Sequence, residues 1–226
     1  MGALYWQIND NWPAPSWSSI DYFGRWKALH YMAKKFFALI SASLVHDEDK
    51  VVLYLVSESK EKESYTARLY IKNMDCEILE IVEQKGIIDG LSSKMVLEIN
   101  IDSHNKIADS VFVEGIVTLE SGIQLKEVET LVPFKYMELK RDKVKVKVTE
   151  DEDKFTLQIS SSCFTPFVEL NFDNADAIFE DNYFHITEKQ PLIVRLKKSD
   201  IYRGSFINAI DVESKLQICT LAESWE

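Results

Sequence analysis

The sequence predicts a mainly β protein, with two tandem antiparallel β-sandwiches preceded by a single βα unit. Three observations support this prediction. Short runs of β-forming residues recur roughly every 10 residues between residues 51 and 220. Pro133 and a charged connector at residues 135–142 divide these runs into two series. One amphipathic helical pattern lies near the N-terminus, directly after a stretch rich in tryptophan.

The N-terminal stretch predicts the βα unit. The apolar run at residues 3–8 reads as a buried strand, and a loop rich in Asn, Asp, Trp and Pro follows it. Residues 25–38 then place Trp26, Leu29 and Phe36 at helical spacing, with no Pro or Gly inside. The C-terminal end of such a strand is where barrel enzymes carry their chemistry, but this sequence contains only one such step.

Two series of strands are expected after the helix. The first series comprises residues 51–56, 65–71, 77–82, 95–101, 109–119 and 123–132. The second comprises residues 144–148, 155–160, 166–172, 177–179, 185–186, 192–196 and 215–220. Apolar and polar positions alternate in both, and each series suits an immunoglobulin-like sandwich. The predicted domains are therefore residues 1–38 (βα unit), 39–136 (first sandwich) and 137–226 (second sandwich).

Composition and charge exclude several classes of partner. The chain of 226 residues has a net charge of −11, so little on it would neutralise nucleic-acid phosphates. No apolar run reaches the roughly 18 residues of a membrane span, and the N-terminus lacks a signal-peptide pattern. Seven scattered glycines form no phosphate loop, and no cofactor is expected.

The cysteines indicate a reducing compartment. Cys76, Cys163 and Cys219 lie far apart, with no Cys-x-x-Cys pair and no glycosylation sequon in the chain. We therefore expect buried thiols and a cytoplasmic location, with one disulfide as the less favoured alternative.

The sequence gives little indication of a metal site or a catalytic site. The acidic runs at residues 47–49, 150–153 and 180–181 fall in predicted turns, where solvated carboxylates keep ordinary acidity. Oxygen ligands at 173–176 could suit calcium, but their spacing does not match an EF-hand, so no metal site is expected. The four histidines assemble into no recognisable triad.

The N-terminal loop leaves two interpretations open. Aromatic rings beside amides and carboxylates are typical of carbohydrate sites, because a ring face packs on the apolar face of a pyranose. A tryptophan-rich core beneath the helix is the alternative. The residues concerned are Tyr5, Trp6, Asn9, Asp10, Asn11, Trp12 and Trp17.

Several segments resemble one known family. The sequences GALYWQIND (2–10), SWSSID (16–21) and RWKALHYMAKKFF (25–37), with Trp12-Pro13 between them, resemble the end of the catalytic barrel of β-mannosidases in glycoside hydrolase family 2. The sandwiches resemble the family's C-terminal immunoglobulin-like domains, with the best local similarity at Phe179–Ile186 (FEDNYFHI).

The resemblance implies a longer parent enzyme. Its (β/α)₈ barrel would precede two C-terminal sandwiches, and this chain would supply barrel strand 8, helix 8 and those sandwiches. Family members use a retaining mechanism with two glutamates at the ends of strands 4 and 7. Both would lie upstream, so we expect no catalytic residue in this chain and no activity of the chain alone. The implied substrate is a mannoside or manno-oligosaccharide with terminal non-reducing β-D-mannose.

The resemblance also assigns substrate-binding residues. Trp6 matches the tryptophan that packs beneath the sugar, and Asn9, Asp10 and Trp12 match the rim beyond it. A stand-alone carbohydrate-binding or interaction module is the alternative function. Because the βα unit would lack its barrel partners, we also expect self-association through this apolar remnant.

Overall fold

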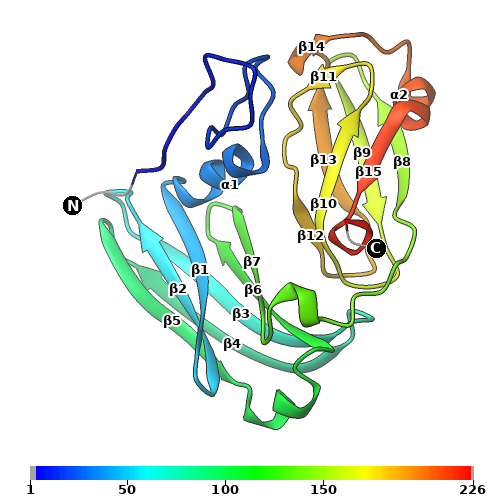
Figure 1. Cartoon of the computed structure of the whole chain (residues 1–226). Helices are drawn as coiled ribbons and strands as arrows, with labels where there is room; N and C mark the ends of the chain where they lie inside the picture. The colour runs from blue at the N-terminus through cyan, green and yellow to red at the C-terminus, as the bar shows by residue number, and fades with distance from the viewer. Residues whose placement is uncertain (1–3, 225–226) are drawn as a thin grey trace. The chain divides into compact units, whose positions relative to one another are not determined.

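The computed structural model describes residues 4–224 and is mainly β, which confirms the predicted fold class (Figure 1). Its contacts divide the chain into two compact units. The middle unit is Phe36–Lys140, and the split unit combines the described residues of Met1–Lys35 with those of Arg141–Glu226. None of the helices in the described part of the chain is long and apolar enough to cross a membrane.

The middle unit is an antiparallel sandwich of two sheets, with strand orders β1-β2-β5 and β4-β3-β6-β7 (Figure 1). Its strands are β1 (Ile40–Asp47), β2 (Lys50–Ser57), β3 (Glu63–Asn73), β4 (Ile78–Ile88), β5 (Ser92–Asn100), β6 (Val111–Leu119) and β7 (Gln124–Thr130). Two 3₁₀ turns accompany them, η1 (Asp102–Ile107) and η2 (Phe134–Tyr136).

The core of the middle unit is largely aliphatic. Ala67, Leu69 and Ile71 alternate along β3 and are fully buried, as are Leu53 and Leu55 on β2. The period of two places these side chains on the inner faces of the two sheets, which is the burial that holds a sandwich together.

The split unit contains the second sandwich, with sheets β13-β9-β8 and β12-β10-β15 and a short pair β11-β14. The strands are β8 (Lys145–Glu150), β9 (Lys154–Ser160), β10 (Thr165–Phe172), β11 (Asp176–Ala177), β12 (Phe184–Ile186), β13 (Leu192–Lys197), β14 (Ile201–Arg203) and β15 (Leu216–Cys219). Helix α2 (Ala209–Lys215) and the turns η3 (Lys198–Asp200) and η4 (Leu221–Glu223) complete it. Its core includes Phe155, Phe172, Phe179 and Phe184.

Helix α1 (Ala28–Phe36) is fixed to the second sandwich within the split unit. The Tyr31 hydroxyl, on a side chain only 2% exposed, accepts a hydrogen bond of 3.2 Å from the Phe179 backbone N–H. Lys34 Nζ donates to the Glu180 carbonyl at 2.8 Å. The apolar face of the helix is therefore covered in part by residues almost 150 positions away in the chain.

Some expected elements differ from the structure. The strand predicted at residues 3–8 is wrong for the described residues 4–8, which form no strand, and the first pairing is a single bridge between Asn9 and Ile20. A strand persists only when a neighbour continues the ladder, and here the bridge is isolated. The predictions also missed β1, β14 and α2, and the helix is shorter than the predicted range 25–38.

Candidate functional site

The aromatic loop, defined here as residues 4–26, presents three tryptophans to solvent. Trp6, Trp12 and Trp17 are 77%, 72% and 81% exposed. These three rings therefore do not form a core beneath the helix, which was one of the two interpretations of the sequence. Trp26 behaves differently, because its ring packs edge-to-face on His30 at 4.3 Å and on Tyr31 at 5.3 Å between centroids.

Asp10 is turned into the loop rather than toward solvent. It is 8% exposed, and its Oδ1 accepts a short hydrogen bond from Ser16 Oγ. Lys27 Nζ donates to Oδ2 at 3.1 Å and to Ser18 Oγ at 2.7 Å. The hydrogen bond from Ser16, with those from Ser18 and Lys27, lowers the pKa of Asp10 below its ordinary value. Asp10 is therefore an ionised anchor that ties the interior of the loop to Lys27, directly after the end of the loop.

A second cluster fixes the start of the loop. Ser19 is fully buried, and its hydroxyl donates to the Ile8 carbonyl at 2.9 Å. Its oxygen also lies 2.9 Å from His30 Nδ1 and 3.1 Å from the Tyr5 hydroxyl. Because the single Ser19 proton is used on Ile8, His30 and Tyr5 must both donate to Ser19. Burial lowers the pKa of His30 and so favours the neutral ring, whose proton then lies on Nδ1.

The predicted substrate-binding residues thus occupy two kinds of position. Trp6, Asn9 and Trp12 are exposed, and the peptide bond between Trp6 and Gln7 is cis. Asn9 Nδ2 donates to the Asp10 carbonyl at 3.3 Å. Asp10 instead borders a shallow pocket of about 390 Å³ that Pro13 and Lys27 also line.

Sequence reasoning assigned no role to Ser16, Ser18 and Lys27, which hold Asp10 in place. The signal was present in the serine-rich segment SWSSID, whose hydroxyls can satisfy buried polar groups in a loop without secondary structure. An exposed ring supported by such a network can serve as a platform for an apolar ligand face, with the Asn9 side chain beside it for polar groups.

The acidic residues once considered for calcium are engaged elsewhere. Asp176 forms an ion pair with Arg203 at 3.4 Å, and Asp173 accepts a hydrogen bond from Gln217. Across residues 4–224, no group of three or more His, Cys, Asp or Glu side chains is placed to hold a metal ion.

Comparison with known proteins places these features in a wider context. Residues 139–223 match the mannosidase family model of an Ig-fold domain. The β-mannosidase of Capra hircus is 29% identical over all of this chain, which covers 26% of that protein. The β-mannosidase of Rattus norvegicus is 30% identical over 84% of this chain, which covers 23% of it.

Solved structures extend the comparison to the fold. The β-D-mannosidase of Dictyoglomus thermophilum is similar with a TM-score of 0.81 and 26% identity, over 96% of this chain and 26% of that one. An exo-chitosanase of Amycolatopsis orientalis shares the fold, with a TM-score of 0.66 and 12% identity over 96% of this chain and 29% of that one. The chain spans about a quarter of the length of the curated relatives it matches along its whole length.

Proposed function

Because this chain is related to β-mannosidases along its whole length and carries their Ig-fold domain, we propose that it forms the C-terminal, non-catalytic portion of a β-mannosidase-like retaining glycoside hydrolase. The parent enzyme would remove terminal non-reducing β-D-mannose, using two glutamates contributed by an upstream barrel. The observation that carries the proposal is the match of 96% of this chain to 26% of a β-D-mannosidase structure.

In this proposal the aromatic loop supplies one wall of the mannose pocket. The Trp6 ring lies beneath the pyranose and contacts its C–H face, and the Asn9 amide and the Trp12 rim contact the sugar beyond it. Asp10 does not contact the sugar itself, since its carboxylate is hydrogen-bonded to Ser16 and Lys27. Its role is to hold the loop in the shape that presents Trp6.

The first test measures hydrolysis by the chain alone and by a complete enzyme that contains it. The purified chain should not hydrolyse an aryl β-mannoside, and turnover well above a blank contradicts the proposal. A chimera in which this chain replaces the matching quarter of the Dictyoglomus enzyme should hydrolyse it. A folded chimera without activity would count against the assignment.

The chimera also tests the loop. Trp6→Ala should lower kcat/KM by roughly 10- to 100-fold, since it removes an aromatic surface buried against the sugar. Trp17→Ala is the matched control, because Trp17 is an equally exposed tryptophan of the same loop and should leave kcat/KM unchanged. Equal losses in both variants would show that the loop matters only as a whole.

A stand-alone carbohydrate-binding module is the second candidate. The exposure of Trp6, Trp12 and Trp17 favours it, because rings presented to solvent are available to sugar without an upstream barrel. Calorimetric titration of the chain with mannose should then give a signal that Trp12→Ala abolishes. No heat at millimolar mannose would remove this candidate.

The same exposed surface supports self-association as a proposal. Leu4, Ile8 and Trp17 are 95%, 59% and 81% exposed and lie in one short segment. Light scattering should show oligomers that Trp17→Ser disperses, whereas a monodisperse monomer would contradict the proposal.

A cytoplasmic location also stays a proposal. Its support is that the three cysteine thiols, among the described residues, form no disulfide with one another. Fractionation of the source cells is its test.

A further inference from the structure

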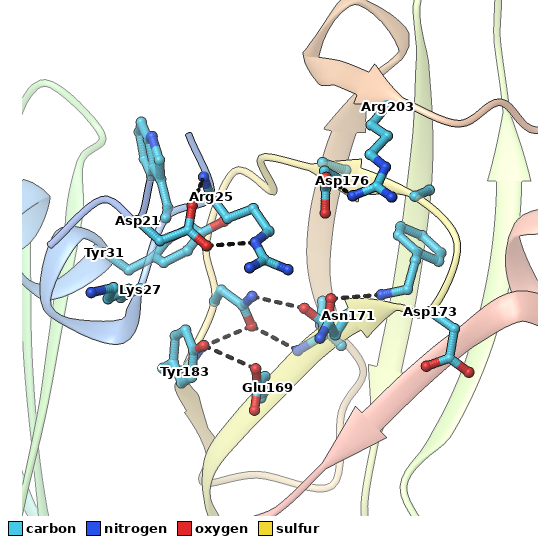
Figure 2. Close-up of a pocket in the computed structure, with 16 residues that line it drawn as sticks. Asp21, Arg25, Lys27, Tyr31, Glu169, Asn171, Asp173, Asp176, Tyr183 and Arg203 are labelled. Carbon is cyan, nitrogen blue, oxygen red and sulfur yellow. Dashed lines mark hydrogen bonds and ion pairs between the residues drawn. The ribbon is translucent and has the colours of Figure 1, made fainter. Parts of the chain in front are cut away.

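The split unit contains a second polar pocket, separate from the aromatic loop positions predicted to bind sugar. We call it the β10 pocket, because β10 forms its floor and the segment leading into α1 forms its opposite wall (Figure 2). Its volume is about 410 Å³, within the range of small-molecule sites. Trp6, Asn9, Asp10 and Trp12 do not line it.

Two of the four carboxylates that line the pocket are ion-paired with arginine. Arg25 Nε donates to Asp21 Oδ2 at 2.6 Å, and Arg203 pairs with Asp176 at 3.4 Å. The other two accept hydrogen bonds from neutral groups, Glu169 from the Tyr183 hydroxyl at 3.0 Å and Asp173 from the Gln217 side-chain amide. The lining therefore carries an excess of negative charge, which disfavours an anion, and its mixture of guanidinium donors and carboxylate acceptors suits the hydroxyl groups of a neutral ligand.

The charged groups of the lining retain capacity for further hydrogen bonds. The ion pair of Arg25 uses Nε, and Figure 2 shows the terminal amino groups turned into the pocket. Tyr183 occupies Glu169 Oε1 and leaves Oε2 as an acceptor. Donors and acceptors side by side are what vicinal hydroxyl groups require, because each hydroxyl both donates and accepts.

Aromatic rings supply the apolar part of the wall. Trp26, Tyr31 and Tyr183 all line the pocket, and the two tyrosine rings lie 5.9 Å apart between centroids. Burial raises the pKa of Tyr31 to about 12, so its phenol is neutral at physiological pH. Flat rings beside carboxylates and guanidinium groups match the two faces of a sugar, one of C–H groups and one of hydroxyls.

The pocket floor is rigid, which favours binding of a small ligand. Asn182 is buried, its Oδ1 accepts from the Leu170 N–H at 2.8 Å, and its Nδ2 donates to the Leu170 carbonyl at 2.9 Å. This amide replaces a strand neighbour at the middle of β10, and it fixes Glu169 and Asn171 on either side of Leu170. Side chains held by such contacts lose little freedom when a ligand binds.

We propose that the β10 pocket is a non-catalytic binding site for a neutral pyranoside, in addition to any site at the aromatic loop. The proposal stands on the pocket's own residues and does not depend on the assignment of the chain to a mannoside hydrolase.

Calorimetric titration of the intact chain with β-1,4-mannobiose tests the proposal. Arg203→Ala and Asn171→Ala should each weaken binding at least fivefold, since both remove a polar group of the lining. Arg203 is 70% exposed, so its loss should leave the fold intact, which a thermal melt checks. Arg195→Ala is the matched control, because Arg195 forms a similar ion pair with Glu180 at 3.2 Å, half exposed and outside the pocket.

Further outcomes separate this site from the aromatic loop. Trp6→Ala should leave the signal of the β10 pocket unchanged. Binding that Trp6→Ala abolishes and Arg203→Ala preserves would place the sugar on the loop and overturn the proposal, as would no binding by the unmodified chain. Mannose 6-phosphate should bind no more tightly than mannobiose, and tighter binding would overturn the inference of a neutral ligand. None of these outcomes bears on whether the chimera described above is active. The proposed function and the proposed β10 site can therefore each fail without the other.

Discussion

Aromatic residues lie on the surface at one end of the chain and in the core at the other. In the aromatic loop, Trp6 and Trp17 are 77% and 81% exposed, whereas Phe155 and Phe164 in the second sandwich are 2% and 1% exposed. The difference follows from the backbone: Phe155 occupies an inward position of β9 with a facing sheet to cover it, and the loop has no facing layer. Rings of the first kind are available for binding, and those of the second kind stabilise the fold.

The largest difference between exposed and buried rings is expected when one ring of each kind is removed. Phe155→Ala should lower the free energy of unfolding by about 3–5 kcal/mol, because it removes a large buried side chain and leaves a cavity. Trp17→Ala should change it by less than about 0.5 kcal/mol. Urea unfolding of both variants measures the contrast. Equal losses would mean that Trp17 is packed in solution and that the loop is not an exposed surface.

A smaller effect is expected from a titratable ring placed among the buried aromatics. His185 lies 4.6 Å from Phe167 between ring centroids, and its Nδ1 accepts from the Phe167 N–H at 3.3 Å. Burial, with a lesser contribution from Lys35, lowers the pKa of His185 to about 4. Between pH 4 and about 6.5 the unfolded chain therefore binds a proton that the folded chain does not.

The sign of this linkage is destabilisation by acid. Stability from His185 is fully present above about pH 6.5 and falls as the pH approaches 4, by up to roughly 3 kcal/mol. The free energy of unfolding, measured by denaturant at several pH values, should fall less steeply in His185→Gln than in the unmodified chain. Parallel pH profiles would show that the imidazole is protonated in the folded state.

The smallest changes in stability should come from removing two tyrosine hydroxyl groups, of which, in the described part of the chain, one has a hydrogen-bond partner and one has none. Within the described residues, the buried Tyr65 hydroxyl of the middle unit makes no hydrogen bond, whereas that of Tyr31 accepts one from Phe179. Tyr65→Phe should raise the free energy of unfolding by about 1 kcal/mol, and Tyr31→Phe should lower it by about 1 kcal/mol. Thermal melts compare the two, and a loss of stability in Tyr65→Phe would reveal a partner such as ordered water.

Much of the sandwich architecture was predictable, because a strand in which apolar and polar residues strictly alternate can be recognised from its own sequence. Strand β1 was missed because its sequence, ISASLVHD, mixes small polar and apolar residues. Its identity depends on pairing with β2 along eight positions. The strand predicted at residues 77–82 ends before Gly86, yet β4 continues through this glycine. A Cβ at Gly86 would come within 2.5 Å of the Tyr65 hydroxyl, so this glycine makes room for a cross-strand ring.

The candidate sites were predictable only in part. Composition singled out the aromatic loop, but exposure decides between a surface and a core, and exposure depends on what the rest of the chain covers. The role of Asp10 was not predictable, because its partner Lys27 lies seventeen positions away on a folded-back segment. The β10 pocket joins Arg25 to Glu169, a juxtaposition that no local pattern contains.

The attachment of Tyr31 to Phe179 has a consequence for the order of events during synthesis. The middle unit is continuous in sequence, so it can fold as soon as residue 140 has left the ribosome. Helix α1 is made earlier, but about 150 further residues must be synthesised before its partner exists, which at roughly 5–20 residues per second takes about 7–30 s. During that interval the second sandwich does not yet cover the apolar face of the helix. A chaperone or an earlier-made segment of the same polypeptide has time to bind there.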